Sequence, residues 1–188
     1  MNKSLIAFAI ASTLSTSAFA ADTYVIDARH TFPSFEVSHL GFSIQRGRFN
    51  KTAGTIVLDA AAKSGSIDIN IDAGSIDTGL AELEKHLQGE DFFDTAKYPA
   101  ITFKSKSLKF DGDKLTGADG DFTLLGVTKP VNLKIDHFKC APHPMNKKAM
   151  CGANATTVIK RSEFGMMKYV PAVGDEVKIA IQVEAFRE

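Results

Sequence analysis

The sequence predicts a mainly β protein, a single eight-stranded antiparallel β-barrel with one short helical insertion around residues 79–93. Along most of the chain, apolar and polar residues alternate with a period of two, as they do in half-buried strands. Short turns separate consecutive alternating stretches, which is typical of an antiparallel meander. A meander of about eight strands favours closure into a barrel.

The alternation is clearest at residues 66–72, where Ile67, Ile69 and Ile71 share one face and polar residues occupy the other. Asp111-Gly112-Asp113 is typical of a tight turn between two strands. On this basis, strands are expected at residues 23–27, 34–39, 43–49, 55–59, 66–72, 101–105, 107–110, 114–124, 127–138, 153–160 and 177–184.

One segment departs from this pattern. Residues 79–89 are rich in helix formers, and their leucines at i, i+3 and i+7 form a single apolar stripe. We expect Thr78 to cap the start of this helix and Gly89 to end it. A second short helical turn is expected over residues 90–93.

The first 20 residues have the pattern of a secretory signal peptide. Lys3 precedes an apolar run, and small residues stand at Ala18 and Ala20. We therefore predict cleavage after Ala20, which leaves residues 21–188 as one domain. The apolar run is about half the ~20 residues that a membrane-spanning helix needs, so no transmembrane segment is expected.

Composition excludes one class of partner. The chain carries 22 basic and 22 acidic residues, a formal net charge of zero, without a long block of either sign. Nucleic-acid binding requires a basic surface, so no nucleic-acid partner is expected. The sequence contains 14 Phe and no Trp, and Phe offers apolar surface without a polar group.

Recognisable catalytic motifs are absent from the sequence. It has no nucleophile elbow, no phosphate-binding glycine loop, no dinucleotide fingerprint and no zinc-protease motif. The five His are scattered, and an isolated His is more often structural than catalytic. We therefore expect a protein that is not an enzyme and has no catalytic cofactor or metal site.

The two cysteines, Cys140 and Cys151, form an even pair in a chain expected to be exported, which favours a disulfide. An alternative is a zinc site formed together with His137 and His143. Such a site requires thiolates, which an oxidising compartment disfavours.

Several segments, in order along the whole mature chain, resemble the YceI-like, polyisoprenoid-binding proteins of bacteria. They are FEVSHLGFS at 35–43, RGRF at 46–49, SIDTG at 75–79, HL at 86–87, DFFD at 91–94, YPAITFKS at 98–105, GDFTL at 120–124, GVTKPV at 126–131 and RSEFG at 161–165. This resemblance implies a lipocalin-like barrel in the periplasm, with an elongated apolar cavity that holds a long-chain isoprenoid without acting on it. It also implies a bound polyisoprenoid or an isoprenoid quinone such as ubiquinone.

Periodicity alone does not distinguish a filled barrel from a hollow one. With the resemblance, we expect a ligand cavity lined by apolar residues of inward strand parity and of the helical insertion. The expected lining is Phe35, Val37, Phe42, Phe49, Ile56, Leu58, Ile69, Phe92, Phe93, Ile101, Phe103, Phe122 and Leu124.

The polar head group of such a ligand needs hydrogen-bonding partners. The candidates are polar residues within the otherwise apolar segments, namely His39, Arg46, Arg48 and His86. Two arginines common in the family's helical insertion are replaced here by Leu83 and Gln88. Because arginine is the preferred partner of phosphate, their loss favours a neutral head group such as a quinone.

Other interpretations remain open from sequence. His39 and His86 could instead be structural, holding the helix against the barrel. The protein could be a periplasmic enzyme that modifies such a lipid through one of these histidines, or a filled barrel that serves as an interaction module. Transient contact with membranes, and either a monomer or a homodimer, are compatible with the sequence.

Overall fold

The structure, a computed structural model, describes residues 21–188. The predicted signal peptide at residues 1–20 lies outside the described residues and stays a prediction. The strands are β1 (Asp22–Ile26), β2 (Phe32–His39), β3 (Ser43–Phe49), β4 (Thr52–Asp59), β5 (Ser64–Asp72), β6 (Ile76–Asp77), β7 (Ala100–Asp111), β8 (Lys114–Leu124), β9 (Val127–Pro142), β10 (Ala149–Lys160) and β11 (Val173–Arg187). The α-helix α1 spans Ala81–Leu87, and two 3-10 turns, η1 and η2, span Ala73–Ser75 and Arg161–Phe164. No helix among residues 21–188 is long and apolar enough to cross a membrane.

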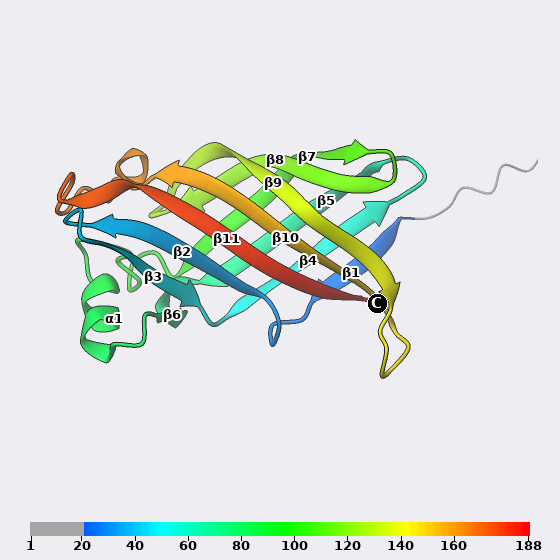
Figure 1. Cartoon of the computed structure of the whole chain (residues 1–188), viewed down its shortest axis with the longest axis horizontal. Helices are drawn as coiled ribbons and strands as arrows, with labels where there is room; N and C mark the ends of the chain where they lie inside the picture. The colour runs from blue at the N-terminus through cyan, green and yellow to red at the C-terminus, as the bar shows by residue number, and fades with distance from the viewer. Residues whose placement is uncertain (1–20) are drawn as a thin grey trace, which may run out of the picture.

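Eight of these strands form a closed antiparallel ring, which confirms the predicted fold class (Figure 1). The ring runs β1-β4-β5-β7-β8-β9-β10-β11 and closes where Val25 of β1 pairs with Phe186 of β11. Closure leaves no free edge in this part of the sheet and creates an interior along the barrel axis.

The remaining strands extend the ring at one end. The C-terminal part of β11 pairs with β1, and the rest of β11 pairs with β2. β1 and β2 therefore lie end to end along the same side of β11, separated by a short interruption. β3 pairs with β2, and β6 pairs with β3 through Phe49 and Ile76. The chain leaves the sheet after Asp77 and returns at β7. We call residues 79–99, which include α1, the lid segment.

The predicted helix is present, but its start differs from the prediction. Leu80 is the N-cap residue, and it has no side-chain capping bond. Thr78 was expected in that position, but Gly79 has a positive φ, so the helix begins two residues later than predicted. The backbone N–H of Thr78 donates to Oε1 of Glu84 at 2.9 Å, and its hydroxyl accepts from the backbone N–H of Leu80 at 3.4 Å. The helical turn expected over residues 90–93 is present only as irregular turns.

The predicted disulfide is present, and it joins Cys140 of β9 to Cys151 of β10 at directly paired positions. Because each sulfur is bonded to the other, neither is available as a thiolate ligand for zinc. No cluster of metal-ligating side chains occurs within residues 21–188.

Asp27 stabilises the interruption between β1 and β2. It accepts a hydrogen bond from the backbone N–H of Arg29 at 3.0 Å, and its Oδ2 lies 2.9 Å from Nδ1 of His30. The His30 contact contributes most to lowering the pKa of Asp27 to about 2. A lowered folded-state pKa gives stability that is complete above the ordinary pKa near 3.8 and is lost as the pH falls through about 2.

We therefore expect Asp27→Asn to lower the free energy of unfolding by about 1 kcal/mol at neutral pH. Denaturant titrations of both proteins at neutral pH and near the lowered pKa of Asp27 measure this difference. The difference should shrink at the lower pH, and a difference that is independent of pH would contradict the assigned role of the carboxylate.

Candidate functional site

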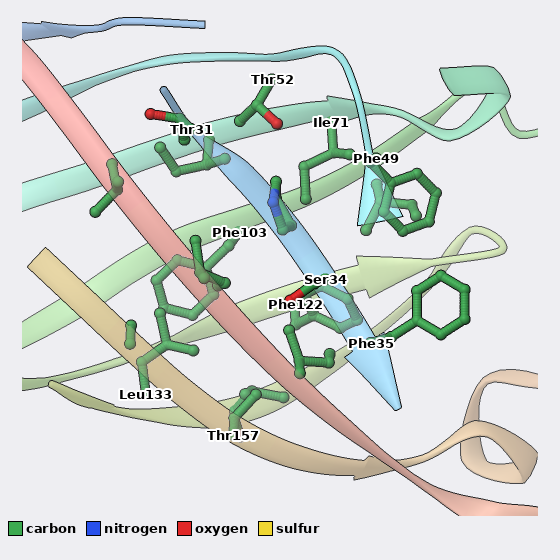
Figure 2. A pocket seen from close by; sticks show the side chains of 18 of the residues that line it. Thr31, Ser34, Phe35, Phe49, Thr52, Ile71, Phe103, Phe122, Leu133 and Thr157 are labelled. Atoms are coloured by element: carbon green, nitrogen blue, oxygen red, sulfur yellow. The ribbon is translucent and has the colours of Figure 1, made fainter. Parts of the chain in front are cut away.

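The barrel interior contains an elongated cavity lined almost entirely by apolar side chains (Figure 2). Its volume is about 210 Å³, counted over the positions that a water centre can occupy. Inward-facing residues such as Phe35, Val37 and Ile179 are only half-buried, because they border this open space rather than other side chains. The barrel is therefore hollow, and the filled-barrel interpretation is wrong.

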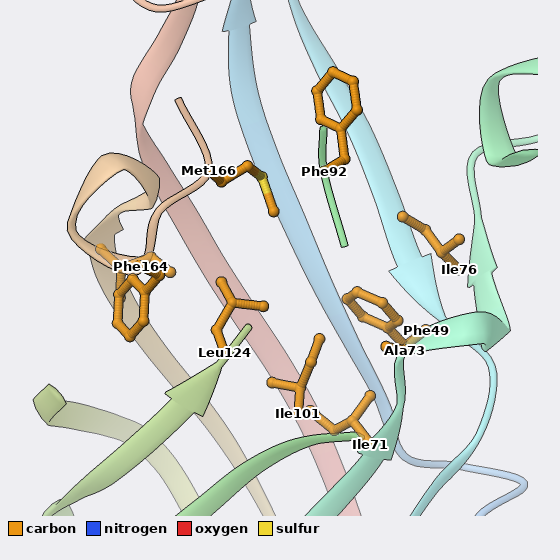
Figure 3. Close-up of a cluster of buried hydrophobic side chains, with 10 residues drawn as sticks. Phe49, Ile71, Ala73, Ile76, Phe92, Ile101, Leu124, Phe164 and Met166 are labelled. Atoms are coloured by element: carbon orange, nitrogen blue, oxygen red, sulfur yellow. The ribbon is translucent and has the colours of Figure 1, made fainter. Parts of the chain in front are cut away.

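A packed apolar cluster lies at the lid end of the cavity (Figure 3). In it, residues of the strands meet Phe92 of the lid segment and Phe164 and Met166 of the η2 region. The ring of Phe93 lies 5.5 Å from that of Phe49, edge to face. Leu87, Phe92 and Phe93 all line the cavity, so the lid segment forms part of its wall.

Polar contacts also attach the lid segment to the barrel. Nε2 of Gln88 donates to the carbonyl oxygen of Gly74 at 3.0 Å. Asp91 forms an ion pair with Lys168 at 3.0 Å. The segment therefore contacts the barrel on both sides, at η1 and at the loop before β11.

The structure places twelve of the thirteen predicted apolar lining residues around the cavity. They are Phe35, Val37, Phe49, Ile56, Leu58, Ile69, Phe92, Phe93, Ile101, Phe103, Phe122 and Leu124. Their placement follows from strand parity, since alternate residues of a barrel strand face the interior.

Phe42 does not line the cavity, and its predicted placement is wrong. It is 91% exposed, at the end of a tight turn between β2 and β3. Leu40 and Gly41 both adopt positive φ in this turn, which reverses the chain before Phe42 can continue the inward parity of β2. Its side chain therefore protrudes from the barrel end.

The four predicted head-group residues lie outside the cavity lining. Arg46 and Arg48 alternate with Phe49 on β3, so they occupy its outer face, where they pair with Glu36 at 3.0 Å and Asp77 at 3.6 Å. Neither arginine borders the cavity, and their role in binding a head group stays a prediction.

The two histidines lie close to the cavity but do not border it. His39 is exposed at the end of β2, paired with the cavity-lining Val173. The ring of His86 lies 4.8 Å from that of Phe92, which does line the cavity. A head group that protrudes from this end could reach either residue, so their binding role stays a prediction.

Sequence reasoning missed the polar groups that do border the cavity. Thr31 exchanges hydrogen bonds with the backbone of Glu184 through its hydroxyl. The hydroxyl of Ser34 donates to the carbonyl of Ala180. The hydroxyl oxygen of Thr52 is buried and has no hydrogen-bond partner among the described residues. A lone Thr in an alternating strand carries no signal that would have identified it.

The other missed residue is Arg161, which borders the cavity and is only 4% exposed. Its guanidinium donates to the carbonyl oxygens of Met166, Val173 and Gly174, each at 2.9 Å. Burial lowers the pKa of Arg161 below its ordinary value, while nearby Asp175 acts in the opposite direction. The RSEFG segment marked this position, but the pattern gave no indication that the arginine is buried.

A closed antiparallel barrel with a hollow apolar interior and a helical lid defines a class of small barrels that can enclose an apolar molecule. The YceI-like domain family matches residues 24–185, and the chain belongs to this family. It is 38% identical to Protein YceI of Escherichia coli O157:H7 over 193 aligned residues, covering 100% of both chains.

Solved structures share the fold. The crystal structure of Burkholderia cenocepacia BcnA superposes with a TM-score of 0.70 at 26% identity, covering 85% of this chain and 98% of that one. A polyisoprenoid binding domain from Saccharophagus degradans superposes with a TM-score of 0.65 at 16% identity, over 88% and 98% of the two chains. At that identity the second similarity shows the fold alone.

Proposed function

We propose that the protein is a periplasmic carrier that holds one long-chain isoprenoid in the barrel and performs no chemistry on it. The observation that carries the proposal is the elongated cavity, whose lining is almost entirely apolar. Such a lining favours a long hydrocarbon chain, because each buried methylene group contributes about 0.8 kcal/mol. Family membership and the polyisoprenoid-binding description of the Saccharophagus degradans domain support the same ligand class.

The polar groups at the cavity favour a neutral head group. The hydroxyl of Thr52 is buried without a hydrogen-bond partner among the described residues, whereas Arg161 already donates to three carbonyl oxygens. A diphosphate requires several free cationic donors, whereas a quinone requires only donors to its carbonyl oxygens. An isoprenoid quinone is therefore the ligand that we expect.

Recovery of the ligand tests the proposal. The full chain is expressed in a Gram-negative host, purified from the periplasmic fraction without detergent, and analysed by native mass spectrometry and organic extraction. We expect a mature protein that begins at Ala21 and carries one long-chain isoprenoid per chain. Apo protein with no extractable lipid, from several hosts, would overturn the proposal.

The two histidines provide a test of the head-group position. If the head group protrudes toward the lid end, His39→Ala and His86→Ala should each weaken quinone binding by ~1–2 kcal/mol, the value of one lost hydrogen bond. Both side chains are exposed, so the melting temperature of the apo protein should hardly change. Titration with a short-chain quinone analogue measures the affinity. Unchanged affinity in both variants would place the head group elsewhere.

A further inference from the structure

Two loops lie together at the lid end of the barrel, beyond the cavity (Figure 1). One is the turn between β2 and β3, and the other is the loop between η2 and β11. The backbone N–H of Leu40 donates to the carbonyl oxygen of Ala172 at 2.8 Å, and His39 pairs with Val173. These contacts join the two loops into one surface.

This surface exposes large apolar side chains from both loops and from the start of β3. We call it the apolar rim, and its members are Leu40, Phe42, Ile44, Met167 and Tyr169. Phe42 is 91% exposed and Met167 is 59% exposed. The side chains protrude from tight turns, since Leu40 and Tyr169 both adopt positive φ. Exposed apolar residues gathered in one place mark an interaction surface.

The rim is also nearly free of charge. Residues 39–45 contain no Asp, Glu, Lys or Arg, and residues 165–173 contain only Lys168. That lysine is paired with Asp91 of the lid segment at 3.0 Å. Charged residues make up 23% of the chain. Two exposed loops that together carry one charge, itself paired, are therefore much poorer in charge than the rest of the molecule. Uncharged apolar loops suit an environment that solvates charge poorly.

The rim adjoins the cavity. Met166 and Val173, which flank the second loop, both line the cavity. The ring of Tyr169 lies 6.2 Å from that of Phe92, a cavity-lining residue of the lid segment. Whatever docks on the rim therefore lies against the lid segment and the end of the cavity.

We propose that the apolar rim inserts into a lipid bilayer and brings the lid end of the cavity against the membrane. The choice of a bilayer over a protein partner rests on the proposed function, because a long-chain isoprenoid resides in membranes and is almost insoluble in water. Because the rim carries almost no charge, its binding would be driven by insertion of apolar side chains and not by attraction to anionic lipids.

Vesicle flotation tests this proposal, with phosphatidylcholine vesicles that contain no isoprenoid. We expect the wild-type protein to float with the vesicles, equally at low and high salt. Phe42→Ser and Met167→Ser should each lower the partition coefficient about tenfold, the effect of withdrawing one large apolar side chain from the bilayer. Met145→Ser is the matched control, because Met145 is 86% exposed in the loop between β9 and β10, at the opposite end of the barrel.

Two results would overturn the proposal. One is a wild-type protein that does not float, which would leave a protein partner or a second copy as the occupant of the rim. The other is an equal loss of flotation in Met145→Ser, which would indicate non-specific adsorption.

Lipid extraction from the same preparations separates this proposal from the proposed function. Protein that floats but never carries an isoprenoid contradicts only the proposed function, and protein that carries an isoprenoid but does not float contradicts only the docking.

Discussion

Replacing Thr157 with phenylalanine is expected to abolish isoprenoid binding and to leave the barrel folded. Thr157 lies on β10, borders the cavity and is paired across the sheet with Ile179, another lining residue (Figure 2). A phenyl ring at this position occupies space that the hydrocarbon chain would need. The cavity cannot hold both the ring and the hydrocarbon chain in the same space, so we expect the affinity to fall by more than about 100-fold. The ring enters open space, so the melting temperature should stay close to the wild-type value.

Thr156→Phe is the control, since Thr156 is the adjacent residue on β10 and does not line the cavity. Both variants are purified from the periplasm under the same conditions, and the extracted lipid is quantified per mole of protein. Ala153→Phe should block the cavity at a second position along the barrel, because Ala153 borders the cavity and is paired with Val183, another lining residue. Full lipid occupancy in both Thr157→Phe and Ala153→Phe would show that the ligand lies outside the barrel.

The strands and their inward faces could be predicted because burial on one face of a sheet leaves a period of two in the sequence. Ile67, Ile69 and Ile71 illustrate this, since all three line the cavity as their alternation indicates. The same argument does not supply ring closure. Closure depends on pairing between Val25 and Phe186, and no local pattern records a contact between opposite ends of the chain.

The errors arose where the backbone departs from regular structure. Phe42 follows a turn in which Leu40 has positive φ, a conformation that a leucine rarely adopts and that its identity therefore does not predict. The helix begins at Ala81 rather than directly after Thr78, because Gly79 has a positive φ and Leu80 is extended, so neither residue is helical. In both cases, a residue with positive φ interrupts the element that the local pattern predicts.

The head-group candidates show a different limit. Arg46 and Arg48 lie within an apolar segment that matches the family, but strand parity places them on the face opposite to Phe49. Applying the period-two alternation to these two residues would have placed their side chains on the outer face of the barrel. The buried position of Arg161 could not be found in this way, because it follows the end of β10, where the period of two stops.

Arg161 carries the second prediction, which concerns stability. Its guanidinium bonds three carbonyl oxygens, those of Met166, Val173 and Gly174, and so ties the chain after η2 to the start of β11. Arg161→Met preserves much of the side-chain volume but removes every donor. Buried carbonyl groups left without a partner cost about 1–3 kcal/mol each, partly recovered where water can enter.

We therefore expect Arg161→Met to lower the free energy of unfolding by about 3 kcal/mol, measured by urea denaturation of delipidated protein. Arg46→Met is the matched control, because Arg46 is exposed on β3 and pairs only with Glu36 among the ion pairs of residues 21–188. Its loss should cost less than about 1 kcal/mol, the usual value of a surface ion pair.

Arg161→Lys should lower the free energy of unfolding by an amount between those of Arg161→Met and Arg46→Met, since a single ammonium group cannot reach three carbonyls in the geometry of the guanidinium fork. Equal, small effects in Arg161→Met and Arg46→Met would mean that these carbonyls are hydrated without the arginine, and that Arg161 is not needed to hold β11 in place.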